Sequence, residues 1–199
     1  MAKSSKQWLQ RHVTDPFVRK AKAQGYRSRA AFKLLELDAR EKLLRPGMRV
    51  LDLGAAPGGW SQVAAQKGAK VTAVDLLPVA PIPGVEVLKG DFREVLKDLP
   101  RFDLVLSDLS PNISGIRNVD QARSLELLQA AIEVCRLSLK PDGAFVAKAF
   151  QGEAFEDARK ALERAFARVK VFKPAASRRE SREIYLVGQR LQFRSAAPY

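Results

Sequence analysis

RVLDLGAAPGGWSQVAAQKG, residues 49–68, joins a short apolar run, a glycine-rich turn and a helical pattern that ends at Gly68. The run 49–54 predicts a buried strand, and residues 58–68 predict a helix. A strand followed at once by a helix is typical of α/β proteins with a mainly parallel sheet. The small residues of the turn allow the backbone to approach a ligand, and the helix presents free N–H groups there.

The same alternation of strand and helix continues along the chain. Strands are predicted at 69–75, 85–91, 102–108 and 143–150, and helices at 28–44, 92–99, 119–139 and 152–166. Ser28 is placed to cap the first of these helices. Two further strands, 168–174 and 182–191, follow each other without a helix, so one strand at the end must be antiparallel. Ligands of such sheets bind beyond the carboxyl ends of the strands.

Length and composition indicate one globular domain. The 199 residues are 46% hydrophobic and 29% charged, and no apolar run approaches the roughly 18 residues of a membrane span. The N-terminus lacks the apolar core of a secretory signal, and the single Cys135 excludes a disulfide framework. We therefore expect a cytoplasmic protein without membrane attachment.

The net charge of +13 is distributed unevenly. It amounts to +9 in residues 1–49, −2 in 50–167 and +6 in 168–199. A near-neutral body with two basic ends is typical of a protein that binds nucleic acid, although charge alone does not separate RNA from DNA. We divide the chain into a basic N-terminal arm (1–27), a single domain (28–191) and a C-terminal tail (192–199).

Acidic residues stand at the ends of three predicted strands. Asp75 ends the second strand, Asp91 follows the third and Asp108 ends the fourth. An acid after the second strand is where nucleoside-binding α/β proteins hold a ribose diol. Each acid alone is better explained as a helix cap. Together with the glycine-rich turn that begins at Gly54, they favour a cofactor that contains adenosine.

One charged residue interrupts the apolar stretch GAFVAKAF, residues 143–150. Lysine is rarely buried unless it is paired, because an isolated buried ammonium group is costly. Lys148 therefore either reaches solvent at the end of its strand or is held in a site that uses it.

The motifs LDLGAAPGGWSQ, DLLPVAPIPGV, GDFR, SDLSPNISG, VAKAFQGE and RRESREIYLVG, with SRAAFKLLELD upstream, resemble those of the FtsJ/RlmE family. Members of this family are ribose 2′-O-methyltransferases of ribosomal RNA that use S-adenosylmethionine. The resemblance runs from about residue 25 to residue 188. It implies a class I methyltransferase fold, which is Rossmann-like and has a seven-stranded, mainly parallel sheet with the last strand antiparallel and helices on both faces.

The resemblance also implies site residues. The catalytic tetrad of the family falls on Lys33, Asp108, Lys148 and Glu183. The cofactor contacts fall on Gly58, Trp60, Asp75, Asp91 and Asp108, to which we add Gly54 from the same turn. A ribose hydroxyl is a poor nucleophile, so the enzyme must align it and accept its proton. Whether Lys148 is the base or mainly orients the hydroxyl stays open, and no metal is required.

The resemblance leaves several substrates possible. The compact length favours the bacterial type of enzyme, which methylates a uridine in the A loop of 23S rRNA within the large ribosomal subunit, and we expect a monomer. The alternatives are transfer RNA or another RNA, and a non-catalytic RNA-binding factor of ribosome assembly. Basic residues near both ends are the candidates for phosphate contacts: Arg11, Arg19, Lys20, Lys22, Arg27, Arg29, Arg178, Arg179 and Arg182.

Overall fold

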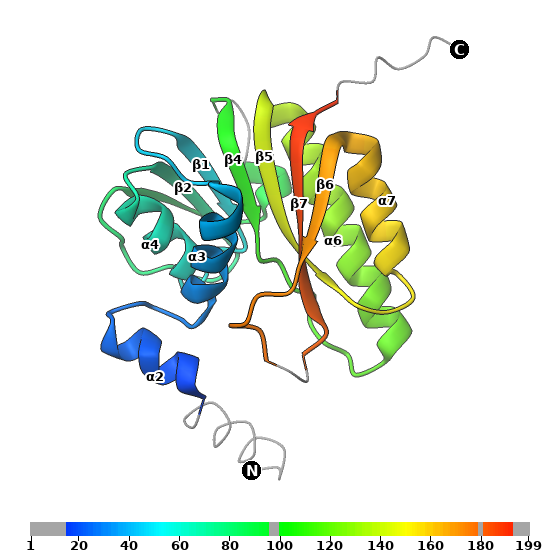
Figure 1. The fold of residues 1–199 in the computed structure, drawn as a ribbon, viewed down its shortest axis with the longest axis horizontal. Coiled ribbons are helices and arrows are strands. Elements are labelled where there is room, and N and C mark those ends of the chain that lie inside the picture. Colours follow the sequence, from blue (N-terminus) through cyan, green and yellow to red (C-terminus); the bar gives the residue numbers. More distant parts are fainter. Residues whose placement is uncertain (1–14, 96–99, 179–180, 193–199) are drawn as a thin grey trace.

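A computed structural model describes residues 15–95, 100–178 and 181–192, which build a three-layer α/β structure around one sheet (Figure 1). The sheet contains seven strands in the order β3-β2-β1-β4-β5-β7-β6. Their bounds are β1 Arg49–Leu53, β2 Lys70–Asp75, β3 Val85–Lys89, β4 Phe102–Ser107, β5 Leu139–Phe150, β6 Phe166–Phe172 and β7 Glu183–Leu191. β7 lies antiparallel between β5 and β6. The predicted sheet is therefore confirmed, including the antiparallel last strand.

Helices cover both faces of the sheet, as predicted. The described helices are α2 Pro16–Ala23, α3 Ala30–Glu41, α4 Gly59–Gln66, α5 Phe92–Val95, α6 Arg117–Ser138 and α7 Phe155–Ala165. α3 and α4 pack on one face, and α6 and α7 pack on the other (Figure 1). None of the helices within the described ranges has the length and hydropathy needed to cross a bilayer.

β1 shows why these strands read as continuous apolar runs. Val50 faces the α3–α4 layer, whereas Leu51 and Leu53 face the α6–α7 layer, and all three are fully buried. A strand covered on both faces needs apolar side chains at consecutive positions rather than at alternate ones. The exception in β1 is Asp52, which is also fully buried.

The start of α3 differs from the expectation. The helix begins at Ala30, Arg29 occupies the N-cap position, and no side chain caps the helix. The prediction that Ser28 is the cap was wrong. Its Oγ lies against α4, where a Cβ atom built on Gly59 would come within 2.3 Å of it, and it has no hydrogen-bond partner in the described part of the chain. Tertiary packing thus takes the hydroxyl away from the first turn.

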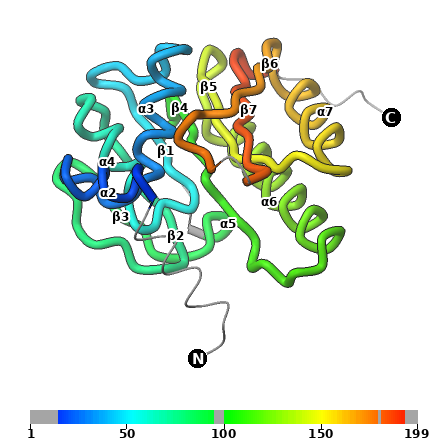
Figure 2. The backbone as a smooth tube through the Cα atoms, turned by 60° about the horizontal axis from the view of Figure 1, so that its bottom comes forward, coloured from blue at the N-terminus to red at the C-terminus, as the bar shows by residue number. Residues whose placement is uncertain are grey.

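α2 anchors the described end of the basic arm to the domain. Phe17 and Ala21 pack against Phe32 of α3 and against Ala176 from the connection between β6 and β7. The Asp15 carboxylate accepts the N–H of Phe17 at 3.0 Å and so caps α2. Figure 2 shows the connection after β6 running across the carboxyl end of the sheet toward the start of α3.

Candidate active site

Four side chains meet at the carboxyl end of the sheet, on the face that α3 covers. Lys33 comes from α3, Asp108 follows β4, Lys148 lies in β5 and Glu183 begins β7. The Lys33 Nζ lies 2.9 Å from Glu183 Oε2, and the Lys148 Nζ lies 3.2 Å from Asp108 Oδ1. Lys148 Nζ also donates to the carbonyl oxygen of Asp108 at 2.8 Å. The structure therefore brings the four predicted catalytic residues together as two ion pairs.

A tyrosine that the sequence reasoning missed connects the two ion pairs. The Tyr185 hydroxyl accepts a hydrogen bond from Lys33 Nζ at 3.1 Å and donates one to Asp108 Oδ1 at 3.0 Å. One continuous chain of contacts thus runs from Glu183 through Lys33, Tyr185 and Asp108 to Lys148. The available signal was strand periodicity, because Tyr185 stands two residues after Glu183 and therefore on the same face.

The direction of β7 is what assembles this cluster. In the antiparallel pairing of β5 and β7, Lys148 stands opposite Tyr185 and Phe150 stands opposite Glu183. Because β7 runs against β5, its first residues meet the last residues of β5 at the carboxyl end of the sheet. A parallel β7 would carry Glu183 to the opposite end.

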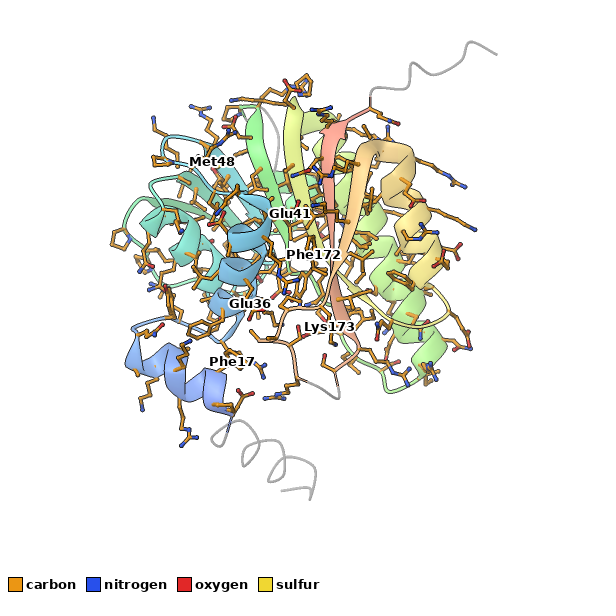
Figure 3. All side chains as sticks on the ribbon, viewed as in Figure 1. Phe17, Glu36, Glu41, Met48, Phe172 and Lys173 are labelled. Atoms are coloured by element: carbon orange, nitrogen blue, oxygen red, sulfur yellow. The ribbon has the colours of Figure 1, made fainter. Side chains whose placement is uncertain are left out.

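Residues just before β7 fasten its start to α3. The Glu36 carboxylate in α3 accepts the N–H groups of Ala175 and Ala176 at 2.6 and 2.9 Å. The Lys173 ammonium group donates to the carbonyl oxygen of Glu183 at 2.8 Å. In Figure 3, Glu36 lies on α3 and Lys173 lies where the chain leaves β6. The contacts hold Glu183 within reach of Lys33.

The cluster is buried and electrically balanced, with two ammonium groups facing two carboxylates. The Lys148 side chain is only 6% exposed, so it is held in the site and does not escape to solvent. Burial by itself raises the pKa of Glu183, but the ammonium groups of Lys33 and Lys148 outweigh burial and hold the pKa below its ordinary value. Burial, reinforced by the carboxylates of Asp108 and Glu183, raises the pKa of Tyr185 well above its ordinary value. The tyrosine is therefore a neutral donor.

A cavity of about 440 Å³ opens beside the cluster, at the carboxyl ends of β1, β2 and β4. Its walls include Gly54, Ala56, Asp75, Leu76, Leu77, Gly90, Asp91, Phe92, Asp108, Leu109 and Asn112. The volume is within the range of small-molecule sites. Gly54 has φ +75°, and a Cβ atom there would come within 2.9 Å of the Leu109 side chain. Only glycine fits this part of the wall without strain.

Two carboxylates stand in this cavity, each held by backbone groups. Asp75 accepts the N–H of Ala56 at 2.8 Å through one oxygen and the N–H of Leu77 at 2.8 Å through the other. Asp91 accepts the N–H of Arg93 at 2.9 Å, and the Arg93 guanidinium group lowers the pKa of Asp91. Asp91 is thus a helix cap and a cavity wall at once. Carboxylate oxygens carry further lone pairs, so both acids can still accept hydrogen bonds from hydroxyl or amino groups of a ligand.

Two other predicted cofactor residues lie outside the cavity wall. Gly58 has φ +104°, and a Cβ atom there would come within 2.7 Å of Ile82 Cδ1. The buried Trp60 side chain donates from Nε1 to the carbonyl oxygen of Ala30 at 2.8 Å, and its ring centroid lies 5.6 Å from that of Tyr185. The indole therefore packs against the tyrosine that connects the two ion pairs.

Asp52, a buried acid, is a second residue that was not predicted from the sequence. Its Oδ2 accepts the Ser61 hydroxyl at 2.6 Å, which ties β1 to the first turn of α4. Burial, with the nearby charges of Asp108 and Asp75, raises the pKa of Asp52 to about 7. The signal was the same one that marked Lys148: a charged residue inside an apolar strand.

The basic residues predicted to contact RNA fall into two groups. Arg19, Lys20, Lys22 and Arg182 are exposed. By contrast, the guanidinium group of Arg27 donates to the carbonyl oxygens of Ala80 and Pro81. Those of Arg29 and Arg178 both contact the Asp15 carboxylate. Arg11 and Arg179 lie outside the described residues.

The donor set at the site suits an organic cation better than a metal ion. Within residues 15–95, 100–178 and 181–192 there is no group of three or more His, Cys, Asp or Glu side chains arranged to hold a metal. The half-buried acids and the glycine at the wall of the cavity fit an adenosine-containing ligand with hydroxyl and amino groups.

A family model and the similar proteins of known sequence all point to one family of methyltransferases. Residues 26–191 match the family model of the FtsJ-like methyltransferases. The chain is 54% identical to a ribosomal RNA large subunit methyltransferase E from Thiobacillus denitrificans, over 94% of this chain and 90% of that protein. It is 51% identical to the protein of the same name from an Azoarcus species, over 94% and 96%.

Solved structures show the same fold. A Plasmodium falciparum protein described as a ribosomal RNA methyltransferase superposes with a TM-score of 0.72 at 29% identity, covering 83% of this chain and 98% of that one. A didemethyltoxoflavin N1-methyltransferase from Burkholderia thailandensis, with S-adenosylhomocysteine bound, has a TM-score of 0.59 at 18% identity, covering 82% and 78%. The second likeness concerns the fold alone.

Proposed function

The chain belongs to the FtsJ-like methyltransferase family, and from this premise we propose that it methylates a ribose 2′-hydroxyl of large-subunit ribosomal RNA, with S-adenosylmethionine as the methyl donor. The target we propose is the A-loop uridine of 23S rRNA in the large subunit. The site of action is the cytoplasm, and the enzyme works as a monomer without a metal.

The observation that carries this proposal is the double role of Asp108. Its side chain lines the cavity, and it also accepts hydrogen bonds from Tyr185 and pairs with Lys148. A cofactor in the cavity and a ribose hydroxyl held by Lys148 would therefore both lie next to Asp108. Proximity of this kind is the main requirement for methyl transfer between two bound groups.

The residues present fit the methyl donor. When bound, S-adenosylmethionine supplies a methyl group activated by a positively charged sulfur. Asp75 would hold the ribose hydroxyls, and Asp91 with Phe92 would hold the adenine ring. The acidic wall complements the positive charge of the donor.

Lys148 is the group that we assign to the ribose hydroxyl. Its Nζ already makes two contacts with Asp108, one to Oδ1 and one to the carbonyl oxygen. A neutral amine that donates both of its hydrogens to Asp108 keeps one lone pair, and that lone pair can accept the proton of the hydroxyl. A charged ammonium group would instead keep one hydrogen to orient the hydroxyl. Tyr185, which accepts a hydrogen bond from Lys33, fixes the carboxylate that holds Lys148.

The assignment of ribosomal RNA as the substrate rests on the relatives and on the net charge. The relatives at about half identity are named as large-subunit ribosomal RNA methyltransferases. The net charge of +13 favours a polyanionic partner. The presence of all four tetrad residues in contact geometry argues against a non-catalytic assembly factor.

The test uses large ribosomal subunits that lack their native ribose methylation. They are incubated with labelled S-adenosylmethionine and with the wild-type protein, Lys148→Ala or the control Lys160→Ala, which changes an exposed lysine of α7. Resistance of the rRNA to alkaline cleavage then maps the modified ribose. We expect one protected A-loop linkage with wild type and control, and a rate at least about 10³-fold lower with Lys148→Ala.

Cofactor binding must be unchanged in Lys148→Ala for this result to concern chemistry. Label in transfer RNA but not in subunits would contradict the substrate. Transfer by Lys148→Ala at more than a tenth of the wild-type rate would contradict the role of the lysine.

A further inference from the structure

A second cavity, of about 410 Å³, lies at the opposite end of the sheet from the catalytic cluster. It is bounded by the end of α3, the starts of β4 and β6 and the end of β7. Its charged walls are Lys42, Arg45, Asp103, Asp142, Arg168 and Arg190. Met48, which also lines it, marks this end of the molecule in Figure 3, far from Phe17 on α2.

The charge of this cavity is positive, with four basic side chains against two acids, Asp103 and Asp142. All four of its basic side chains are exposed, and none of them forms an ion pair within the part of the chain that the structure describes. Of the two acids, Asp103 is already engaged by Lys140 at 2.6 Å and by the N–H of Arg49 at 2.8 Å. By comparison, Lys170 on the neighbouring surface is paired with Glu41 at 2.6 Å. The cavity thus offers four cations to an anionic ligand.

The backbone at two of these cations is unfavourable. Lys42 has φ 53° and Arg190 has φ 61°, and they are the non-glycine residues with positive φ in the described ranges. Both line this cavity. Lys42 stands at the C-cap of α3, where a left-handed residue is usually glycine. A left-handed backbone conformation at two basic residues of one cavity points to a function for their side chains.

We propose that this cavity binds phosphodiester groups of ribosomal RNA, as a second contact remote from the nucleotide that is methylated. The inference rests on the proposed function. Lysine and arginine contact phosphates without reading sequence, and so they position a substrate.

The distance between the cluster and the second cavity indicates that a ligand of both is a large, folded RNA. Arg190 stands seven positions after Glu183 of the cluster along β7, which corresponds to roughly 23 Å of extended strand. A single nucleotide cannot occupy both sites. An RNA that is structured within a ribosomal subunit can reach both ends of the protein at once.

The test exploits the left-handed backbone. In the double variant Lys42→Gly/Arg190→Gly, two charges are lost while glycine relieves the backbone, so the variant should melt at the same temperature as wild type or higher. The matched control is Lys160→Ala/Arg164→Ala, which removes two exposed charges from α7. Binding of undermethylated large subunits is measured against salt concentration for each protein, along with methylation of the subunits and of a short A-loop hairpin.

We expect the glycine variant to bind subunits about tenfold more weakly, with a salt slope lower by about 1.5 to 2. The control should match wild type, and the hairpin should be methylated equally by all three proteins because it cannot span both sites. Unchanged subunit affinity in the glycine variant, or an equal loss in the control, would overturn the inference. An equal loss on the hairpin would also overturn it. A wild-type protein that methylates neither RNA would instead refute the proposed function.

Discussion

The cluster that we propose as catalytic and the cavity that we propose for the cofactor share Asp108 but are built differently. The cluster consists of side chains that bind one another, and three of its five residues, Lys148, Glu183 and Tyr185, project from neighbouring strands. The cavity is lined mainly by the loops after β1, β2, β3 and β4, and its carboxylates are held by backbone N–H groups.

The difference suits the roles that we propose for the two regions. Proton transfer and alignment need side chains that are fixed to within a fraction of an ångström, which regular elements and mutual ion pairs provide. Binding a cofactor that enters and leaves needs an accessible wall, which loops over a rigid sheet provide. Asp108 is rigid enough for the first task and exposed enough for the second.

Asp52 is coupled electrostatically to both regions, because the charges of Asp108 and Asp75 both raise its pKa. The folded-state pKa of about 7 exceeds the ordinary value of 3.8. Between these values the unfolded chain loses the proton while the folded protein keeps it. Asp52 therefore destabilises the wild type progressively as pH rises from about 4 to about 7, with no further change above that.

We expect Asp52→Asn to remove this titration, since an amide oxygen can still accept the Ser61 hydroxyl. The difference in unfolding free energy between variant and wild type should grow across this window by up to roughly 4 kcal/mol. Urea denaturation at a series of pH values measures it, with Asp142→Asn as the exposed control. Parallel pH dependence in Asp52→Asn and wild type would show that Asp52 does not titrate in this range.

Asp75→Ala tests the cavity side alone. Loss of a charge-assisted hydrogen bond to the ribose should raise the Kd for S-adenosylmethionine about 10- to 100-fold. The kcat at saturating cofactor should stay within about twofold of wild type. Calorimetry and initial rates separate the two effects, and Asp157→Ala, at an exposed position of α7, controls for charge. A lower kcat with unchanged Kd would mean that Asp75 supports the chemistry instead.

Tyr185→Phe tests the cluster side alone, with a smaller effect. The ring still packs on Trp60, while Lys33 and Asp108 each lose one hydrogen bond. We expect kcat to fall about tenfold with the cofactor Kd unchanged. Wild-type kcat in this variant would contradict a positioning role.

Local patterns predicted most of the fold because both faces of the sheet are covered. The apolar runs of β1, β4 and β5 identified the strands. A lysine inside one of them marked a possible site, and the family motifs supplied the other residues. The patterns did not identify Tyr185, since a tyrosine in a strand is ordinary. Nor did they separate the exposed basic residues from Arg27 and Arg29, because a guanidinium group binds the protein's own carbonyl or carboxylate oxygens as readily as phosphate.

The order of strands and helices along the chain and the motifs of the family could be recognised in the sequence. The spacing of apolar residues and the glycine-rich turn act over a few residues and are visible in the chain. The tertiary structure alone decided the partners: Lys33 with Glu183, 150 positions apart, and Tyr185 between the two ion pairs. Those contacts depend on β7 entering the sheet antiparallel between β5 and β6, and register across such distances is set by packing of the whole domain.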